Sequence, residues 1–394
     1  MRIDEIESIK TLCTGCMGCV DACPSQCISK ITDINGFACT NIDSSKCVNC
    51  GKCAVVCPVV NSKKNAFEQC CFAAYAKDKK VHNRGSSGGI FEVLASWALE
   101  NNYYVSGAGF DELKVKHLIV DNRNDLKVLL KSKYIQSDTL GIYEKIKQLL
   151  LQGEKVLFSG TPCQVSALKN YVSDKYLSNL ILVDIVCHGV PSQKVFDMYI
   201  KDLENEKEGK ISKFSFRVKD NVYKHSNGYH YTLTRDGKEK VVNGVYSQSS
   251  FYNAFKHYLI FRNSCYECKY ATPDRVSDIT LGDFWGIEKL DFDGDNDTGV
   301  SMVIINSSVG KELFLNICDK LIFKEFPLKY GISANPCLSK SSIRPKNRDE
   351  IIDSILNNGY VQTADKYFRK GSVLKPLFWL LPLSIRKILR RLRG

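Results

Sequence analysis

The sequence predicts a small α+β module at the N-terminus, then an α/β body with a mostly parallel sheet, then a C-terminal amphipathic helix. Three observations support this prediction. A cysteine-rich run occurs twice within the first sixty residues, strand and helix patterns alternate from residue 70 onward, and the last residues combine basic side chains with helical apolar spacing. With 394 residues the chain is long enough for two or more domains, each with its own core.

We expect five segments along the chain. The stretch "NSKKNAFEQ" (61–69) is polar and charged, and it marks the boundary between the module and the body. The expected segments are the module (1–62), the first part of the body (70–155), its second part (156–330), a C-terminal extension (331–372) and a basic amphipathic tail (373–394).

The use of cysteine indicates metal binding rather than disulfide formation. The chain has 18 cysteines, ten of them before residue 60, and most of these ten stand at metal-ligand spacing. The opening "MRIDEIESIK" is charged and lacks the apolar segment of a signal peptide. We therefore expect reduced thiols and a cytoplasmic location.

Charge is uneven along the chain. The net charge is +12, but residues 365–394 hold nine Lys/Arg against one Asp and so carry +8 of it. The remainder is only weakly basic, which argues against nucleic-acid binding through a general basic surface. Apolar runs such as "NLILVDIVC" are too short to span a bilayer.

The two cysteine-rich runs carry the strongest signal in the sequence. Both "CTGCMGCVDACP" (13–24) and "CVNCGKCAVVCP" (47–58) follow the pattern C-x2-C-x2-C-x3-C-P. This is the bacterial two-cluster ferredoxin run, in which three cysteines bind one 4Fe-4S cluster and the fourth binds the other. The module is therefore predicted to be ferredoxin-like. Its first cluster takes Cys13, Cys16, Cys19 and Cys57, and its second takes Cys47, Cys50, Cys53 and Cys23.

A pair of zinc sites is the alternative, because C-x2-C pairs also bind zinc. Two complete four-cysteine runs, each closed by proline, favour the clusters. Cys27 and Cys39 fall outside the pattern, and Cys70 and Cys71 are adjacent in sequence. We expect these four thiols to pack as small apolar residues.

Strand and helix patterns alternate through the body. The segments "CCFAAYAK", "YYVSGAGF", "KVLFSG" and "NLILVDIVC" predict strands, whereas "IYEKIKQLLLQG" and "QVSALKNYV" predict helices. Another helix follows the turn "SSGG" (86–89), which leaves backbone N–H groups free at a helix N-terminus. Such a turn suits a phosphate group, but a plain helix cap is the alternative, and the turn alone does not decide between them.

Four further cysteines lie in the body. Cys163 follows the strand "KVLFSG" and Cys187 ends "NLILVDIVC". Ligands bind at the carboxyl ends of strands in open α/β sheets, so these two thiols meet if their strands are neighbours. The segment "CYECKY" adds Cys265 and Cys268, and the four would complete a third 4Fe-4S cluster. The alternative is that Cys163 and Cys187 are core thiols and that the later pair binds zinc or nothing.

Several segments, in order, resemble the coenzyme F420 hydrogenase/dehydrogenase beta subunit family. They are "SSGGIFEVLA", "SKYIQS", "LFSGTPCQVSALK", "VDIVCHGVPS", "CYECKYA" and "SDITLGDFWGI", and together they cover roughly residues 70–310. The resemblance implies an iron–sulfur oxidoreductase whose FAD lies near a 4Fe-4S cluster. It also supports the four body cysteines as the ligands of that third cluster.

The resemblance further indicates residues that contact the flavin or the substrate. They are Ser86, Ser87, Gly88 and Gly89 in the turn, Ser132, Lys133 and Tyr134 in "SKY", Arg217 and Lys219 in "FSFRVKD", and Asp283 in "GDFWG". Solvated surface charge is the alternative for the basic members of this set. The sequence assigns no catalytic acid or base.

The expected function is electron transfer between the clusters and FAD, and on to a two-electron acceptor. That acceptor is a deazaflavin coenzyme or another small molecule, and surface polysaccharide synthesis is one setting that the relatives suggest. The expected partner is a redox protein or a small-molecule electron donor or acceptor. The alternative is a non-enzymatic electron-carrier subunit, which carries electrons to or from a partner enzyme.

The tail "KPLFWLLPLSIRKILRRLRG" combines apolar and basic residues. Ile385, Ile388, Leu389 and Leu392 share one face of a predicted helix, and Lys and Arg cover the rest. This composition favours a helix that lies on an anionic membrane surface, which would place the chain peripherally at the inner face. Docking on the body or on an acidic partner is the alternative.

Overall fold

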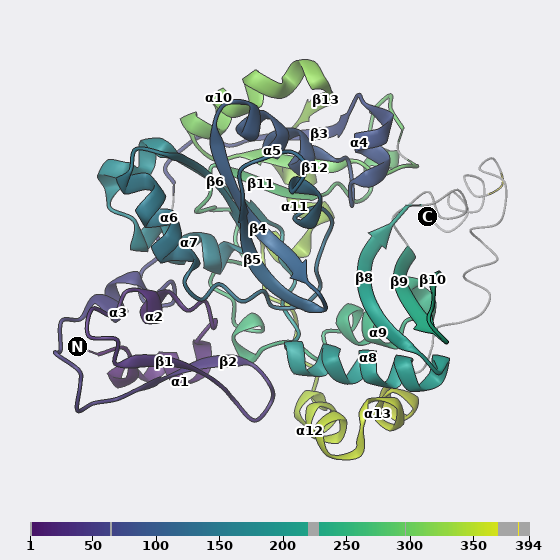
Figure 1. Ribbon diagram of the computed structural model, residues 1–394. Helices are drawn as coiled ribbons and strands as arrows, with labels where there is room; N and C mark the ends of the chain where they lie inside the picture. Colours follow the sequence, from purple (N-terminus) through teal and green to yellow (C-terminus); the bar gives the residue numbers. More distant parts are fainter. Residues whose placement is uncertain (1, 64, 220–227, 296, 369–384, 386–394) are drawn as a thin grey trace.

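The computed structural model of the protein describes residues 2–63, 65–219, 228–295, 297–368 and 385. Figure 1 shows an N-terminal module beside a body that contains a large central sheet and a second, smaller sheet. The predicted amphipathic tail (373–394) lies outside the described residues except for Ile385. No helix within the described ranges has both the length and the apolar character needed to cross a bilayer.

The N-terminal module is a small region of strands and helices, as predicted. Its two strands, β1 (Ile28–Thr32) and β2 (Ala38–Ile42), pair antiparallel. Its helices are α1 (Glu7–Leu12), α2 (Gly18–Asp21) and α3 (Lys52–Val56). Its apolar core combines aliphatic side chains, such as Ile3, Ile28 and Val59, with about as many cysteines.

The body is built on an eight-stranded sheet with the order β13-β3-β12-β11-β7-β6-β4-β5. The strands are β3 (Cys70–Ala76), β4 (Tyr103–Asp111), β5 (Lys114–Val120), β6 (Lys155–Gly160), β7 (Leu180–Ile185), β11 (Ile279–Asp283), β12 (Ser301–Ile305) and β13 (Leu321–Phe326). The predicted strands at 70–77, 103–110, 155–160 and 179–187 correspond to β3, β4, β6 and β7.

The prediction of a mostly parallel sheet is wrong. Within the described residues, the β4–β6, β6–β7 and β7–β11 pairs are parallel, whereas the other four pairs are antiparallel. All five residues of β12 are buried, although both neighbours of this strand are antiparallel to it. A strand covered on both faces is apolar throughout whatever its direction, so its sequence does not distinguish the two kinds of pairing.

Helices cover both faces of this sheet. Helices α5 (Ile90–Glu100) and α10 (Ser308–Ile317) pack against the face that carries Leu157. On the opposite face, α6 (Ile142–Leu151) and α7 (Pro162–Tyr171) pack against Val156 and Phe158, the neighbours of Leu157 in β6. The helices expected at 142–153, at 164–172 and after the "SSGG" turn are therefore confirmed.

A second sheet was not predicted from the sequence. It consists of β8 (Lys210–Val218), β9 (Gly228–Arg235) and β10 (Lys238–Val245), all antiparallel. An aromatic core joins it to the helices α8 (Gln193–Lys207), α9 (Ser250–Lys256), α12 (Arg348–Asn358) and α13 (Tyr360–Tyr367). The short helices α4 (Lys79–Arg84) and α11 (Leu328–Ala334) both contact β3 of the large sheet.

Replacing Leu157 with alanine tests the importance of the central strand β6. Leu157 is fully buried, so we expect Leu157→Ala to lower the free energy of unfolding by about 2–5 kcal/mol. The control is Leu315→Ala in α10, where the side chain is 61% exposed and the change should stay within about 0.5 kcal/mol. Urea denaturation of both variants measures the difference. Equal losses would contradict a core centred on β6.

Candidate functional site

The two cysteine loops of the module share one backbone conformation. Gly15 and Met17 in the first loop have φ of 64° and 57°, and Asn49 and Gly51 in the second have 52° and 72°. These residues occupy equivalent positions in the two repeats. Left-handed residues turn the chain sharply, so each loop curves back on itself.

The structure brings the cysteines of the two runs together. The thiol of Cys19 interacts electrostatically with Cys13 and Cys57 of its predicted set and also with Cys53 of the other set, and the thiol of Cys16 interacts with Cys19 and Cys57. One small cavity is lined by the second predicted set, Cys23, Cys47, Cys50 and Cys53, together with Cys27. The fourth cysteine of each run therefore lies near the other run. Metal ligation by these residues stays a prediction.

The other thiols of the chain differ in their surroundings. Cys27 is buried and its Sγ lies 3.4 Å from the Sγ of Cys23, at the second set. Cys71 is buried in the sheet, whereas Cys39 and Cys70 are half-buried. Packing therefore accounts for Cys71 as predicted, while Cys27 lies beside predicted metal ligands.

The body brings Cys163, Cys187, Cys265 and Cys268 together. Strands β6 and β7 are parallel neighbours, and Gly160 pairs with Asp184, so Cys163 and Cys187 follow adjacent strands at the same edge. Cys265 ends the short 3-10 helix η5 (Asn263–Cys265) and Cys268 follows it. The thiol of Cys187 interacts electrostatically with the other three.

Burial controls the chemistry of these four thiols. Removal from water raises the pKa of Cys163 to about 11 and that of Cys265 to about 12, and it also raises the pKa of Cys187 and Cys268. Neighbouring thiols of the set add to the effect at Cys163, Cys187 and Cys265, because thiolates repel one another. A positively charged metal centre would reverse this preference by binding the thiolate forms.

A single metal ion and a four-iron cluster require different distances between their ligands. No group of three or more His, Cys, Asp or Glu side chains in the described part of the chain is arranged to hold a single metal ion. The ligands of a four-iron cluster bind four separate iron atoms, so they stand farther apart than the ligands of one zinc ion. Four thiols are also the ligand set that such a cluster uses.

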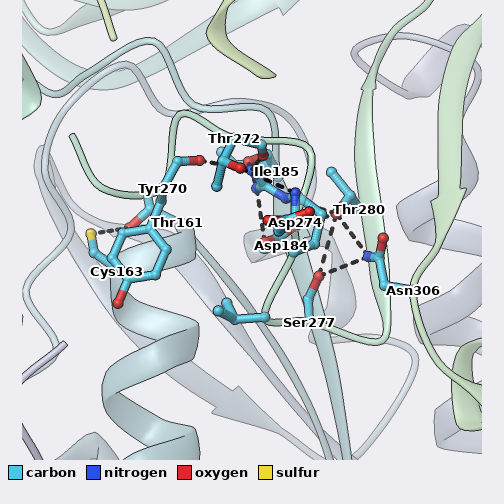
Figure 2. A network of polar contacts seen from close by, with 12 residues as sticks. Thr161, Cys163, Asp184, Ile185, Tyr270, Thr272, Asp274, Ser277, Thr280 and Asn306 are labelled. Carbon is cyan, nitrogen blue, oxygen red and sulfur yellow. Dashed lines mark hydrogen bonds and ion pairs between the residues drawn. The ribbon is translucent and has the colours of Figure 1, made fainter. Parts of the chain in front are cut away.

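A buried ion pair fixes the segments that carry these cysteines. Arg275 lies beyond Cys268, and its Nη2 donates to Asp184 Oδ2 at 2.8 Å, at the end of β7. Its Nη1 donates to the backbone oxygen of Tyr270 at 2.9 Å, and its Nε donates to Thr280 Oγ1 at 3.2 Å. Figure 2 shows this network beside Cys163. The pair therefore ties the chain after Cys268 to the strand that leads to Cys187.

A cavity of about 1160 Å³ opens beside the third cysteine set. Most of the predicted flavin-contacting residues line it. The predicted residues that line it are Ser86, Ser87, Gly89, Ser132, Lys133, Tyr134, Arg217, Asp283, Cys163, Cys187, Cys265 and Cys268. The structure thus brings together residues that are up to 197 positions apart in the sequence.

Gly88 and Lys219 support the cavity from outside its lining. Gly88 N donates to Ser301 Oγ at 2.9 Å, and a Cβ at Gly88 would collide with the backbone oxygen of Ala74. Lys219 Nζ donates to the backbone oxygens of Ser87 and, at 2.7 Å, of His82. Both residues therefore hold the "SSGG" turn in place.

The turn presents an unsatisfied polar group. Ser86 Oγ accepts a hydrogen bond from Ser132 N at 2.9 Å, which joins two of the predicted segments. Ser87 Oγ is buried without a hydrogen-bond partner among the described residues. Gly89 has a φ of 81° and caps α5, an eleven-residue helix. A buried hydroxyl with no partner is costly, and a ligand in the cavity could satisfy it.

Basic side chains surround the turn. Burial lowers the pKa of Lys133 and Lys219 to about 7, and it lowers that of Lys131. Arg217 forms an ion pair with Asp283, with 3.0 Å between Nη2 and Oδ1, so this carboxylate is already engaged. An anion in the cavity would favour the charged forms of the lysines.

Sequence reasoning missed two buried residues of this cavity, His117 and Arg262. His117 Nε2 lies 3.0 Å from the backbone oxygen of Ser159, which can only accept, so this nitrogen carries the proton. Its Nδ1 is buried without a described partner and is left as an acceptor. No local motif indicates His117, whereas Arg262 stands three residues before Cys265.

Comparison with known proteins gives two family matches. Residues 12–61 match a 4Fe-4S dicluster domain, and residues 153–329 match the family described as the C terminus of the coenzyme F420 hydrogenase/dehydrogenase beta subunit. These matches confirm the resemblance that the sequence motifs indicated. They relate the chain to iron–sulfur proteins and to oxidoreductase subunits.

Two individual proteins are also similar. The coenzyme F420-dependent sulfite reductase of Methanocaldococcus jannaschii is 30% identical over 161 residues, which are 32% of this chain and 25% of that protein. The chain thus matches only a quarter of the length of this curated relative. A chain of the F420-reducing NiFe hydrogenase complex from Methanosarcina barkeri is 17% identical with a TM-score of 0.42, and the match covers 77% of this chain and 91% of that one.

Replacing Asp184 with asparagine tests the buried ion pair. The side chains of Asp184 and Arg275 are 0% and 2% exposed, so Asp184→Asn would leave a buried cation without its counter-ion. We expect a loss of about 3–5 kcal/mol in the free energy of unfolding, measured by chemical denaturation. The matched control is Asp291→Asn, which removes an exposed partner of Lys324 and should change little. A tolerated Asp184→Asn would show that the pair does not fix these segments.

Proposed function

We propose that the chain is an iron–sulfur flavoprotein oxidoreductase. Residues 153–329 match the family of the C-terminal part of the coenzyme F420 hydrogenase/dehydrogenase beta subunit, and residues 12–61 match a 4Fe-4S dicluster domain, which supports this proposal. The chain moves electrons between ferredoxin-type clusters and FAD, and on to a two-electron acceptor. The acceptor is a deazaflavin coenzyme or another small molecule. Four-iron clusters exchange single electrons and a flavin exchanges one or two, so together they connect the two kinds of redox chemistry.

One observation carries this proposal: the first and third cysteine sets are adjacent. The thiol of Cys16 in the module interacts electrostatically with that of Cys163 in the body. Both residues belong to one apolar cluster with α6 and α7. A ligand of the first predicted cluster thus stands beside a ligand of the third. The module and the cavity can therefore exchange electrons within one chain.

The cavity supports the assignment of FAD. Its volume of about 1160 Å³ is slightly larger than the usual range for ligand pockets, roughly 300–1,000 Å³, so it has room for a large cofactor. The buried hydroxyl of Ser87 and the N-terminus of α5 suit a phosphate group. Lys133, which lines the cavity, would add positive charge on the same side. We propose that Ser87, the N-terminus of α5 and Lys133 hold the diphosphate of FAD, that Lys219 supports the turn from behind, and that the ring system lies toward the third cysteine set.

The iron and flavin content tests the proposal directly. We expect anaerobically purified protein to hold about twelve iron atoms, as three four-iron clusters, together with one FAD. Cys265→Ser should lower the iron to about eight, because it removes one ligand of the third cluster. Iron, acid-labile sulfide and flavin are measured on each variant.

The matched control is Cys318→Ser, since Cys318 is half-buried after α10 and bonds only to a backbone oxygen of its own helix. This variant should keep the wild-type iron. About eight iron atoms in the wild type and in Cys265→Ser, with no flavin, would contradict the proposal. That result would favour a non-enzymatic subunit that carries electrons to or from a partner enzyme.

Replacing Ser87 with alanine tests the phosphate site separately. If Ser87 Oγ donates to a phosphate oxygen, its loss removes a hydrogen bond to a charged group, worth about 1.5–3 kcal/mol. We expect FAD to bind about tenfold to a hundredfold more weakly to Ser87→Ala, as measured by fluorescence titration of flavin-depleted protein. Ser333→Ala is the control, because Ser333 is exposed in α11. Unchanged affinity in Ser87→Ala would place the phosphate elsewhere.

A further inference from the structure

Arg262 is a buried arginine between the two adjacent cysteine sets. Its side chain is only 6% exposed, and it lines the cavity three residues before Cys265. The iron-ligand patterns in the sequence do not include it, and the proposed function assigns it no role. Burying a guanidinium is costly unless its donors are satisfied, so its contacts show what it does.

The side chain of Arg262 reaches into the N-terminal module. Its Nη1 donates to the backbone oxygen of Cys13 at 2.9 Å, and its Nη2 donates to that of Ala38 in β2. Its Nε donates to Gln136 Oε1 at 3.3 Å, and Gln136 Nε2 in turn donates to the backbone oxygen of Thr14 at 2.9 Å. The guanidinium therefore holds the first cysteine loop directly and through Gln136.

The same contact explains why glycine occupies position 15. A Cβ at Gly15 would collide with Arg262 Nη2 and with the backbone oxygen of Ala38. The equivalent residue of the second loop is Asn49, which has the same left-handed conformation but carries a side chain. The first loop is thus shaped to receive Arg262, and the second loop is not.

The backbone of Arg262 belongs to the third cysteine set. Its N–H donates to the backbone oxygen of Val190 at 3.0 Å, three residues after Cys187. Its own backbone oxygen accepts from Cys265 N at 3.0 Å. One residue therefore fixes the segments of Cys187 and Cys265 through its backbone and the loop of Cys13 through its side chain.

Among the described residues, no acidic side chain forms an ion pair with Arg262. Its partners are carbonyl oxygens, one amide and the ring of Phe37, whose centroid lies 5.2 Å from Cζ. No described carboxylate lies within the 4.0 Å that defines an ion pair with it. It interacts electrostatically with the thiols of Cys163 and Cys265. Thiolates and added electrons at these sets would supply the missing negative charge.

We propose that Arg262 is a positioning residue that locks the first cysteine loop against the third cysteine set and stabilises reduction at both by its charge. The part that concerns the third set rests on the proposed function. Each cluster takes up one electron on reduction, and no bond forms or breaks. A fixed cation beside it lowers the free energy of the more negative form, so reduction becomes easier.

The test is a redox titration of the full chain, purified anaerobically and monitored by EPR. Arg262→Gln removes the charge but keeps a polar side chain. We expect the equilibrium constant for reduction at the first and third sets to fall about tenfold, which is about 59 mV for a one-electron couple. The second set is an internal reference. Arg235→Gln is the matched control, because Arg235 is 57% exposed and pairs with Glu208 at the surface.

A second variant separates the charge of Arg262 from its geometry. Arg262→Lys keeps the charge but cannot form the fork of hydrogen bonds. We expect potentials closer to wild type but faster proteolysis between residues 61 and 69, because the module is held less firmly. If Arg262→Gln retains too little iron to titrate, faster cleavage of Arg262→Lys still supports the positioning role, and unchanged cleavage overturns it.

Unchanged potentials in an iron-replete Arg262→Gln protein would overturn the role of the charge. This result differs from a failure of the proposed function, which would appear in the wild type as about eight iron atoms and no flavin. In that case the potential of the first cluster still tests Arg262, because the contact with Cys13 does not depend on the third set.

Discussion

The parallel pairing of β6 with β7 is the constraint on which the whole site depends. Parallel neighbours place their carboxyl ends at one edge of the sheet, so the residues that follow them meet without being close in sequence. Cys163 and Cys187 follow these two strands, and the "SSGG" turn opens onto the same cavity. The buried pair of Asp184 and Arg275 then holds the later cysteine segment against this edge. The cavity and the third cysteine set therefore share one scaffold.

The predictions from sequence succeeded where the chemistry is local. Eight cysteines of the module could be assigned to two sets because cluster ligation demands fixed short spacings. The structure brings the two cysteine runs together, with Cys19 and Cys57 near Cys53 as well as near Cys13, and the assignment to two clusters stays a prediction. Strands β6 and β7 and helices α6 and α7 were predicted because their apolar residues recur at the expected periods. The motifs that resemble a known family led to most of the cavity's lining, although no single motif is specific alone.

The predictions failed where long-range contacts decide the outcome. The direction of β3 and β12 could not be inferred, since strands buried on both faces look alike whichever way they run. The second sheet was not predicted because β9 and β10 show no regular alternation of buried and exposed residues. His117 and Arg262 could be recognised as site residues only through hydrogen bonds to residues that are distant in the sequence. Ser159 is 42 positions from His117, and Cys13 is 249 positions from Arg262.

The composition of the module's core has a consequence for how the protein is made. Thiols such as Cys53 and Cys57 share this core with about as many aliphatic side chains. Cysteine buries little apolar surface, so without a metal this core would contribute less to stability than an aliphatic core of the same size. On the proposed function, iron would stabilise the module much as a structural zinc ion stabilises a zinc finger. Metal supply would then govern the folding of this module, and iron starvation would leave a folded body attached to an incompletely folded N-terminus.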